Sequence, residues 1–372
     1  MPATGSRRGR SLGRASLPAG RTRSAQAPDQ AGESPTWVSA VGYDRFRAEA
    51  PTGRRPAAAN PMSGLSVVVP THNRSDLLAI TLRSVLRQRD VDLEVIVVDE
   101  ASTDDTAGML AALGDSRVRS IRHETSLGVS TARNHGAAEA QGEWVAFTDD
   151  DDLWAPDKLS RQLRAANATG RDWAYAGSVN ITDGFRIVHG VPPLPPEQVA
   201  AVLPHYNAVP GGGSNVIVRR DTLQRVGPFD VRLLNTEDWE MWIRLAKAGP
   251  PAWVRSPLVA RRVHPSNSSL DITEIVRGTR LIEQLHGTTA DWGRLRRWLA
   301  ESYLRTGQRR AALGQFALAA VSGQAGNVAR DLMTIARRRL GRGSSTGPEM
   351  EGSDPGWVAE AAAWLHELER VG

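Results

Sequence analysis

Four consecutive aspartates, Asp149–Asp152, are the residues of this sequence best suited to do chemistry. They follow a short apolar run, Trp144–Phe147, which is typical of a buried strand. Carboxylates this close repel one another, so placing them at a strand end is costly unless a cation or hydrogen-bond donors compensate. A divalent metal carrying a diphosphate is the obvious compensator, because hard cations prefer oxygen ligands and leave positions free for phosphate and water. The run therefore indicates a metal-diphosphate site.

An alternation of strands and helices must position these aspartates. Leu65–Val69 and Leu93–Val98 predict two buried strands, with a helical spacing of apolar residues between them. The first strand ends at Pro70–Arg74 and the second ends at Asp99. The carboxyl ends of parallel strands share one edge of the sheet, where ligands bind. We therefore expect an α/β fold with a mostly parallel sheet and a site at that edge.

Seven blocks of sequence occur in an order that is more specific than any one of them. The blocks are Leu65–Arg74, Val97–Thr106, Ala132–Asn134, Phe147–Leu159, Gly227–Asp230, Thr236–Trp242 and Arg261–His264. Together they resemble the family-2 inverting glycosyltransferases, over residues 65 to about 270. The resemblance implies the GT-A fold, with a Rossmann-like, mostly parallel sheet. It also implies hexosyl transfer from a nucleotide-diphosphate sugar to a hydroxyl of a glycan, a glycolipid or a cell-surface polysaccharide precursor.

The resemblance assigns nucleotide contacts to the strand ends. It implies that Pro70, Thr71 and Arg74 line the nucleotide and that Asp99 hydrogen-bonds the base. A carboxylate can accept a hydrogen bond from a nucleobase N–H, and the resemblance implies uracil N3–H and therefore UDP as the expected nucleotide. Arg133 matches an arginine of the nucleotide pocket, and the alternative is a solvated arginine near a helix N-terminus.

The aspartates receive separate roles from the same resemblance. Asp149 or Asp150 is expected to face the ribose, and Asp151 to bind Mn²⁺ or Mg²⁺. His264 matches a late metal-ligand or phosphate-contacting histidine, although an isolated histidine is more often an ordinary loop residue. Asp152 is expected to cap the following turn.

The second half of the domain is expected to bind the acceptor. Gly213 and Ser214 lie where the family shapes its acceptor pocket, and we assign Trp239 to the same pocket. The resemblance makes Asp238 the general base, with Glu237 in support, although an acidic pair at a helix start is also a common cap. Asp238 would deprotonate the acceptor hydroxyl, which attacks the anomeric carbon opposite the diphosphate and inverts it.

Composition and charge divide the 372 residues into segments. The net charge is +5, and ten arginines against four acidic residues lie in the first 60 positions. We expect a disordered basic segment over 1–61, with Met62 as an alternative translation start, and a transferase domain over 62–270. A helical region over 271–340 and a linker with a short terminal helix over 341–372 complete the chain.

The same composition bears on partners and location. No cysteine is present, which excludes disulfides and thiolate metal sites. No apolar run approaches the roughly 18 residues of a membrane span, and no secretion signal is found, so we expect a cytoplasmic protein. The early arginines are not interleaved with aromatic residues, so no nucleic-acid partner is expected.

The helical region carries the spacing of one tetratricopeptide-like hairpin, from Tyr303 to Ala319. A lone repeat cannot bury its face, so we expect it to pack on the catalytic domain or on a second copy in a homodimer. Phe316 is expected to be part of a core. The arginines around it suit either solvent or a peripheral contact with the inner face of the membrane, where a lipid-linked acceptor would lie.

Two alternatives to a glycosyltransferase remain open from the sequence. A sugar nucleotidyltransferase would share the sheet and the carboxylates, but it should carry glycine and lysine after the first strand, which Pro70–Arg74 lacks. A non-catalytic scaffold with a relict transferase domain would need no intact site, whereas Asp99, Asp151, Asp238 and His264 are all present.

Overall fold

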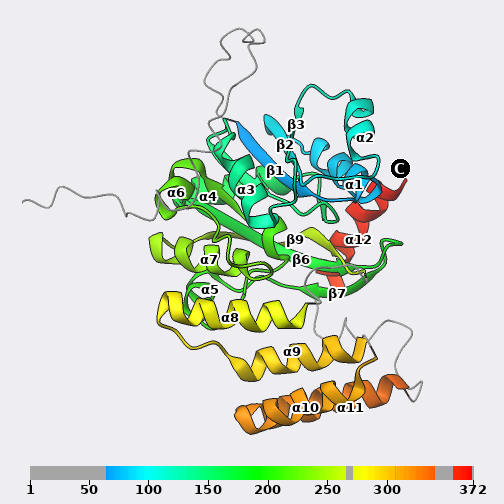
Figure 1. Cartoon of the computed structure of the whole chain (residues 1–372), viewed down its shortest axis with the longest axis vertical. Coiled ribbons are helices and arrows are strands. Elements are labelled where there is room, and N and C mark those ends of the chain that lie inside the picture. Colours follow the sequence, from blue (N-terminus) through cyan, green and yellow to red (C-terminus); the bar gives the residue numbers. More distant parts are fainter. Residues whose placement is uncertain (1–63, 265–270, 306, 340–354, 371–372) are drawn as a thin grey trace, which may run out of the picture. The chain divides into compact units, whose positions relative to one another are not determined.

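The computed structural model describes residues 64–264, 271–305, 307–339 and 355–370 (Figure 1). The expected basic segment 1–61, the start at Met62 and the linker up to residue 354 lie outside these residues. The strands are β1 (Leu65–Thr71), β2 (Leu93–Asp99), β3 (Val118–Arg122), β4 (Trp144–Phe147), β5 (Leu153–Trp154), β6 (Trp173–Ile181), β7 (Ile187–Val191), β8 (Ile217–Arg219) and β9 (Ala252–Arg262).

The described strands form one sheet in the order β3-β2-β1-β4-β8-β6-β9-β5, with β7 beside β6. The first four strands in this order run parallel, and β6 is parallel to β9, whereas β8 is antiparallel to both of its neighbours. The predicted α/β fold with a mostly parallel sheet is therefore confirmed. The predicted buried strands at Leu65, Leu93 and Trp144 are also present.

Helices cover both faces of the sheet. They are α1 (Ser75–Leu86), α2 (Thr106–Leu113), α3 (Val129–Ala138), α4 (Lys158–Thr169), α5 (Pro196–Val202), α6 (Arg220–Val226), α7 (Glu237–Ala248), α8 (Ile272–His286), α9 (Trp292–Arg305), α10 (Arg309–Ala319), α11 (Ala325–Arg339) and α12 (Pro355–Glu369). Alternate residues of β1 point to opposite faces, as a strand requires. Val68 joins the core with α3 and α7, whereas Val67 and Val69 join the core with α1 and α4.

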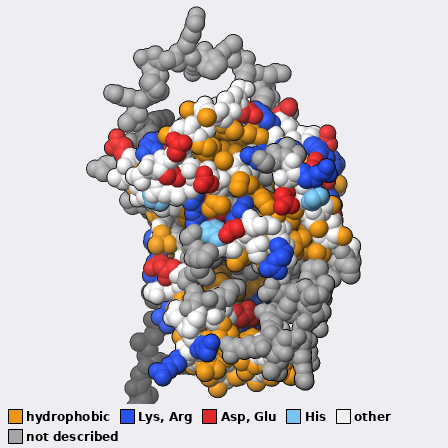
Figure 2. All heavy atoms as spheres, turned by 90° about the vertical axis from the view of Figure 1, so that its right-hand side faces the viewer, with side chains coloured by type: hydrophobic (Ala, Val, Ile, Leu, Met, Phe, Trp, Pro, Cys, Tyr) orange, Lys and Arg blue, Asp and Glu red, His pale blue; other side chains and the backbone are white. Residues whose placement is uncertain are grey.

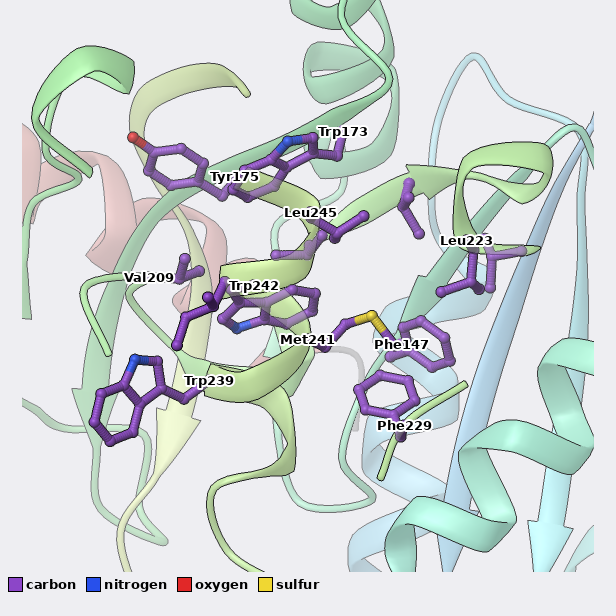
Figure 3. Close-up of a cluster of buried hydrophobic side chains, with 14 of the residues drawn as sticks. Phe147, Trp173, Tyr175, Val209, Leu223, Phe229, Trp239, Met241, Trp242 and Leu245 are labelled. Atoms are coloured by element: carbon purple, nitrogen blue, oxygen red, sulfur yellow. The ribbon is translucent and has the colours of Figure 1, made fainter. Parts of the chain in front are cut away.

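The core around α7 fixes the helix that begins at Glu237. Figure 3 shows Trp239, Met241, Trp242 and Leu245 of this helix among aromatic side chains from the sheet and the loops. Phe147 at the end of β4 meets Phe229 edge to face, with ring centroids 5.0 Å apart. This packing brings the start of α7 close to the end of β4, where the aspartates begin.

The C-terminal helices extend this domain (Figure 1). Ile282 of α8 belongs to the α7 core, and α9 and α10 form the predicted hairpin, which buries Phe316 with Ala300 and Val328. The terminal helix α12 packs Leu365 against the sheet, and Trp364 Nε1 donates to the Pro257 carbonyl over 3.0 Å. None of the helices in the described ranges is long and apolar enough to cross a membrane.

Candidate active site

The four aspartates after β4 are held by different partners. Thr71 Oγ1 donates to Asp150 Oδ2 over 2.7 Å. Arg74 Nη1 lies 3.0 Å from Asp150 Oδ1 and 2.9 Å from Asp151 Oδ2. Burial raises the pKa of Asp150 to about 6, and the charge of Arg74 opposes that rise. The end of β1 thus binds the aspartates directly, as the shared sheet edge led us to expect.

Asp152 is held by the far half of the sheet, and the expectation that it caps the following turn is wrong. Its Oδ2 accepts from Ser214 Oγ over 2.5 Å, and its Oδ1 accepts from the backbone N–H of Arg262 over 3.1 Å. Ser214 Oγ also accepts from the Asp149 N–H over 2.9 Å. The reason is that both donors come from residues distant in the sequence: Ser214 from the turn before β8 and the Arg262 N–H from the end of β9.

Three of the aspartates can share one cation. One carboxylate oxygen each from Asp149, Asp151 and Asp152 lies within 4.8 Å of the other two. His264 Nε2 lies 2.9 Å from Asp151 Oδ2, on the edge of this group. Burial raises the pKa of Asp152 well above its usual value, and the charges of Asp151 and Asp149 raise it further. A hard divalent cation fits this all-oxygen set, because it would relieve the repulsion between the carboxylates.

Arg133 joins the aspartates to the start of α7. The side chain is 2% exposed, so the alternative of a solvated helix arginine is wrong. Its Nη2 pairs with Asp149 Oδ1 over 2.5 Å, and its Nη1 pairs with Glu237 Oε1 over 2.7 Å. Gly213 permits this arrangement, because a Cβ built there would lie 2.5 Å from Arg133 Nη2. The guanidinium is therefore a fixed charge between two acidic groups.

Glu100 positions the helix that carries Arg133, a role that no sequence motif predicted. Its Oε2 accepts from the backbone N–H groups of Leu127 and Gly128, over 2.5 Å and 2.7 Å, just before α3 begins. A carboxylate at this place also interacts favourably with the positive end of the helix dipole. Glu100 thus anchors the loop from which α3 delivers Arg133.

At the start of α7, Glu237 is buried and Asp238 is half-buried, and the pKa of both carboxyl groups is raised. Burial raises the pKa of Glu237 to about 7, against the lowering effect of Arg133. Burial also raises the pKa of Asp238, and Arg133 again opposes it. Asp238 Oδ1 accepts from the Trp239 N–H over 2.6 Å, and its Oδ2 accepts from Asn207 Nδ2 over 3.2 Å. Asn207 was not predicted, since it lies alone in a loop with no motif around it.

Two cavities meet at this network. The aspartate cavity, of about 530 Å³, is lined by Pro70, Thr71, Arg74 and the four aspartates, among others. The Asp238 cavity, of about 430 Å³, is lined by Asp238, Trp239, Asn207 and Gly213, among others. Both cavities include Arg133, Asp149, Asn235, Glu237 and Arg261. The two cavities therefore lie side by side, with Arg133 and Asp149 between them.

Three of the predicted site residues, Asp99, Ser214 and His264, lie outside both walls, and His264 reaches the site through its contact with Asp151. Asp99 is buried at the end of β2, where it accepts from the Ser102 N–H over 2.9 Å and pairs with Arg122. Ser214 is fully buried behind the aspartates and holds Asp152.

The C-terminal helices supply a wall that the sequence did not predict. Ile275 and Thr279 of α8 and Leu295 and Trp298 of α9 line the Asp238 cavity. Helical periodicity alone cannot show which site a helix faces, so no sequence signal could have found this wall.

Comparisons with known proteins show the family to which the chain belongs. Residues 66–227 match Glycosyl transferase family 2. The chain is 30% identical over 239 residues to TuaG of Bacillus subtilis (strain 168), which carries the name of a teichuronic acid biosynthesis glycosyltransferase, covering 61% of this chain and 92% of TuaG. The chain belongs to glycosyl transferase family 2. It is therefore a glycosyltransferase, and this membership decides against a sugar nucleotidyltransferase.

Other relatives and one structure agree with this membership. The chain is 28% identical to the Escherichia coli UDP-Glc:alpha-D-GlcNAc-diphosphoundecaprenol beta-1,3-glucosyltransferase WfaP, over 60% of this chain and 87% of WfaP. It is 38% identical to the succinoglycan biosynthesis protein ExoO of Rhizobium meliloti (strain 1021), over 31% of this chain and only 33% of ExoO. The crystal structure of S. aureus TarS in complex with UDP-GlcNAc matches with a TM-score of 0.52 and 18% identity, over 75% of this chain and 92% of that chain. This structural match shows the shared GT-A fold.

Replacing the buried guanidinium should test whether it holds the two acidic groups together. We expect Arg133→Met to lower the free energy of unfolding by about 3–5 kcal/mol, because Asp149 and Glu237 would lose their shared partner. Chemical denaturation monitored by tryptophan fluorescence measures this change. Arg232→Met is the matched control, since Arg232 pairs with Asp230 at the surface and should cost below about 1 kcal/mol. Equal losses in the two variants would contradict the structural role of Arg133.

Proposed function

We propose that the protein transfers a hexose from a UDP-sugar to a hydroxyl acceptor, with inversion and with the help of Mn²⁺ or Mg²⁺. The observation that carries the proposal is the placement of Asp238. Of the two cavities, Asp238 lines only the Asp238 cavity. Asp151 and Asp152, which belong to the carboxylates suited to a metal, line only the aspartate cavity. A base and a leaving group on opposite sides of the reacting carbon are what inversion requires.

The aspartate cavity is the proposed donor site. Pro70, Thr71 and Arg74 would line the nucleotide, and Asp149 or Asp150 would face the ribose. The names of two similar proteins support a UDP-sugar, since TarS is described in complex with UDP-GlcNAc and WfaP is named for UDP-Glc. For Asp99 to bind the base, the pairing with Arg122 at the surface would have to open.

The metal would be held by Asp151 together with Asp149, Asp152 or His264. Bound there, it would neutralise negative charge on the departing diphosphate. The chain itself contributes Arg74, whose guanidinium already lies against Asp150 and Asp151 and can donate to phosphate oxygens. Intact Asp151, Asp238 and His264 also support an active enzyme over a relict scaffold.

Asp238 is the proposed general base. Its burial raises the pKa towards the range in which a base is effective, and the Asn207 amide keeps the carboxylate charged and oriented. Glu237 supports it by fixing Arg133, which lowers the pKa of both acidic groups. An acceptor hydroxyl in the Asp238 cavity would give its proton to Asp238 and attack the anomeric carbon.

The acceptor is proposed to be a precursor of a cell-surface polysaccharide. Trp239 and Gly213 line the Asp238 cavity, and Trp298 closes it from α9. Tyr206 in the same wall is covered by the Arg294 guanidinium, 3.9 Å from the ring centroid. Aromatic and cationic groups side by side suit a sugar ring with an attached phosphate. The name of WfaP specifies such an acceptor, a sugar on a lipid diphosphate, which would be met at the inner face of the membrane.

Neutralising the base should stop transfer without affecting nucleotide binding. We expect Asp238→Asn to lower the rate of UDP release from UDP-Glc, with a GlcNAc-diphospholipid as acceptor, by about 10²–10⁴-fold. UDP affinity, measured by calorimetry, should stay unchanged because Asp238 lies outside the aspartate cavity. Asp221→Asn, on the exposed first turn of α6, is the control. Unaltered turnover in Asp238→Asn would defeat the assignment.

The pH profile should report the hydrogen bond between Asn207 and Asp238. This bond favours the charged carboxylate, so its loss raises the pKa of Asp238. Because the base acts when deprotonated, we expect Asn207→Ala to move the acid limb of kcat/KM to higher pH. The shift should be about 0.5–1 unit, given the net worth of one hydrogen bond. Asn327→Ala on α11 should leave the profile in place, and a shift to lower pH would contradict the role of Asn207.

Metal dependence is tested by titrating the full chain with UDP, GDP and dTDP, each with Mn²⁺ and with EDTA. We expect UDP to bind tightly only with Mn²⁺, and Asp151→Ala to abolish the metal-dependent part. Asp221→Ala should bind as the unaltered chain does. Equal UDP affinity in Mn²⁺ and EDTA would rule out the proposed metal site, and preference for GDP or dTDP would rule out the UDP donor.

A further inference from the structure

The last described helices before residue 340 expose apolar side chains on one surface. We define the α10–α11 face by its exposed aliphatic and basic residues: Leu313, Leu318, Val321, Leu332, Met333, Arg309, Arg310 and Arg330. Val321 is 82% exposed, Leu313 is 62% exposed and Met333 is 56% exposed. Isolated exposed aliphatic residues are normal, but a group of five on one short helical pair indicates a surface that meets an apolar partner.

These side chains are not left over from an incomplete core. The inward side of α10 and α11 already packs Ala312, Phe316, Ala319 and Val328 against α9, and all four are buried. Leu313 of α10, Val321 in the Ala320–Gln324 segment that joins α10 to α11, and Met333 of α11 all face solvent. The helices thus have one side for the α9 hairpin and a second apolar side that faces solvent.

The charge of the face is one-sided. Within residues 309–336 the sequence has a single acidic residue, Asp331. Asp331 is already neutralised, because Arg297 Nε and Nη2 bind its carboxylate over 2.7 Å and 2.9 Å. Figure 2 shows hydrophobic side chains gathered at the lower end of the molecule with basic side chains beside them, where Figure 1 places α10 and α11. Exposed aliphatic and cationic side chains without exposed acidic ones suit a partner that offers both an apolar layer and negative charge at its surface.

We propose that the α10–α11 face binds the surface of an anionic lipid bilayer. The aliphatic side chains would enter the boundary between head groups and acyl chains, and the arginines would meet lipid phosphates. A second copy of the chain fits less well, because a symmetric contact would bring the arginines of this face against the same arginines without a carboxylate between them. This inference rests on exposure and charge alone and does not depend on the proposed reaction.

The test measures binding of the full chain to vesicles by co-sedimentation. Vesicles of phosphatidylcholine alone are compared with vesicles that also contain phosphatidylglycerol. We expect binding to the anionic vesicles, weakened by salt, and little binding to phosphatidylcholine. Tight binding to both kinds of vesicle, or to neither, would overturn the proposal.

Two triple variants separate the apolar and the ionic parts of the contact. We expect Arg309→Gln, Arg310→Gln and Arg330→Gln together to weaken binding to anionic vesicles by roughly 100-fold, at about fivefold for each arginine. Leu313→Gln, Val321→Gln and Met333→Gln together should weaken it at every salt concentration, because they remove buried apolar area.

A matched control and a fold check keep the result interpretable. Leu127→Gln with Val231→Gln changes two aliphatic residues that are 45% and 40% exposed on the transferase domain, and it should leave vesicle binding unchanged. Circular dichroism and UDP binding verify that each triple variant is folded. If both triple variants bind as tightly as the unaltered chain, the contact lies elsewhere. A dimer that the aliphatic triple variant dissociates, without vesicle binding, would assign the face to a second copy.

Discussion

The buried guanidinium of Arg133 is the charge on which the arrangement of the site depends. Its guanidinium links two regions that are far apart in the sequence, the end of β4 and the start of α7. Without it, the buried carboxylate of Glu237 would lose its charged partner, and its burial would favour the protonated form. Phe229 covers the guanidinium at 5.5 Å, which further excludes water from the pair.

Several features from different parts of the chain position the Arg133 side chain. Glu100 gathers the backbone N–H groups before α3, and α3 then carries Arg133 inward. Gly213 leaves the space into which the guanidinium fits. The turn before β8 supplies Ser214 and the end of β9 supplies the Arg262 backbone, and both fix Asp152 while Arg133 fixes Asp149. The strands from β3 to β4 therefore present the carboxylates, and the segments around β8 and β9 hold Asp152 in position.

Local patterns in the sequence were enough to predict the parts of this site that depend on nearby residues. The strands at Leu65, Leu93 and Trp144 and the aspartates after them follow from apolar runs and from the shared sheet edge, and the structure confirms that geometry. The partners of Asp152 could not be predicted, because the Ser214 and Arg262 donors are 62 and 110 residues away. Asn207 and Glu100 are single polar residues whose role appears only when loops meet. Partnerships across the sheet are set by tertiary packing rather than by local spacing.

Helix α9 connects the two regions to which we assign binding. Trp298 and Leu295 line the Asp238 cavity, while Ala300 packs against Phe316 of α10. The α10–α11 face, which is the proposed bilayer contact, lies on the outer side of that hairpin, and α9 lies between it and the Asp238 cavity. An acceptor anchored in lipid loses much of its translational freedom, and an enzyme held at the same surface meets it at a high effective concentration. A helical region of this kind therefore needs no catalytic residue to matter for catalysis, because its packing fixes how far the cavity lies from the surface where the substrate is presented.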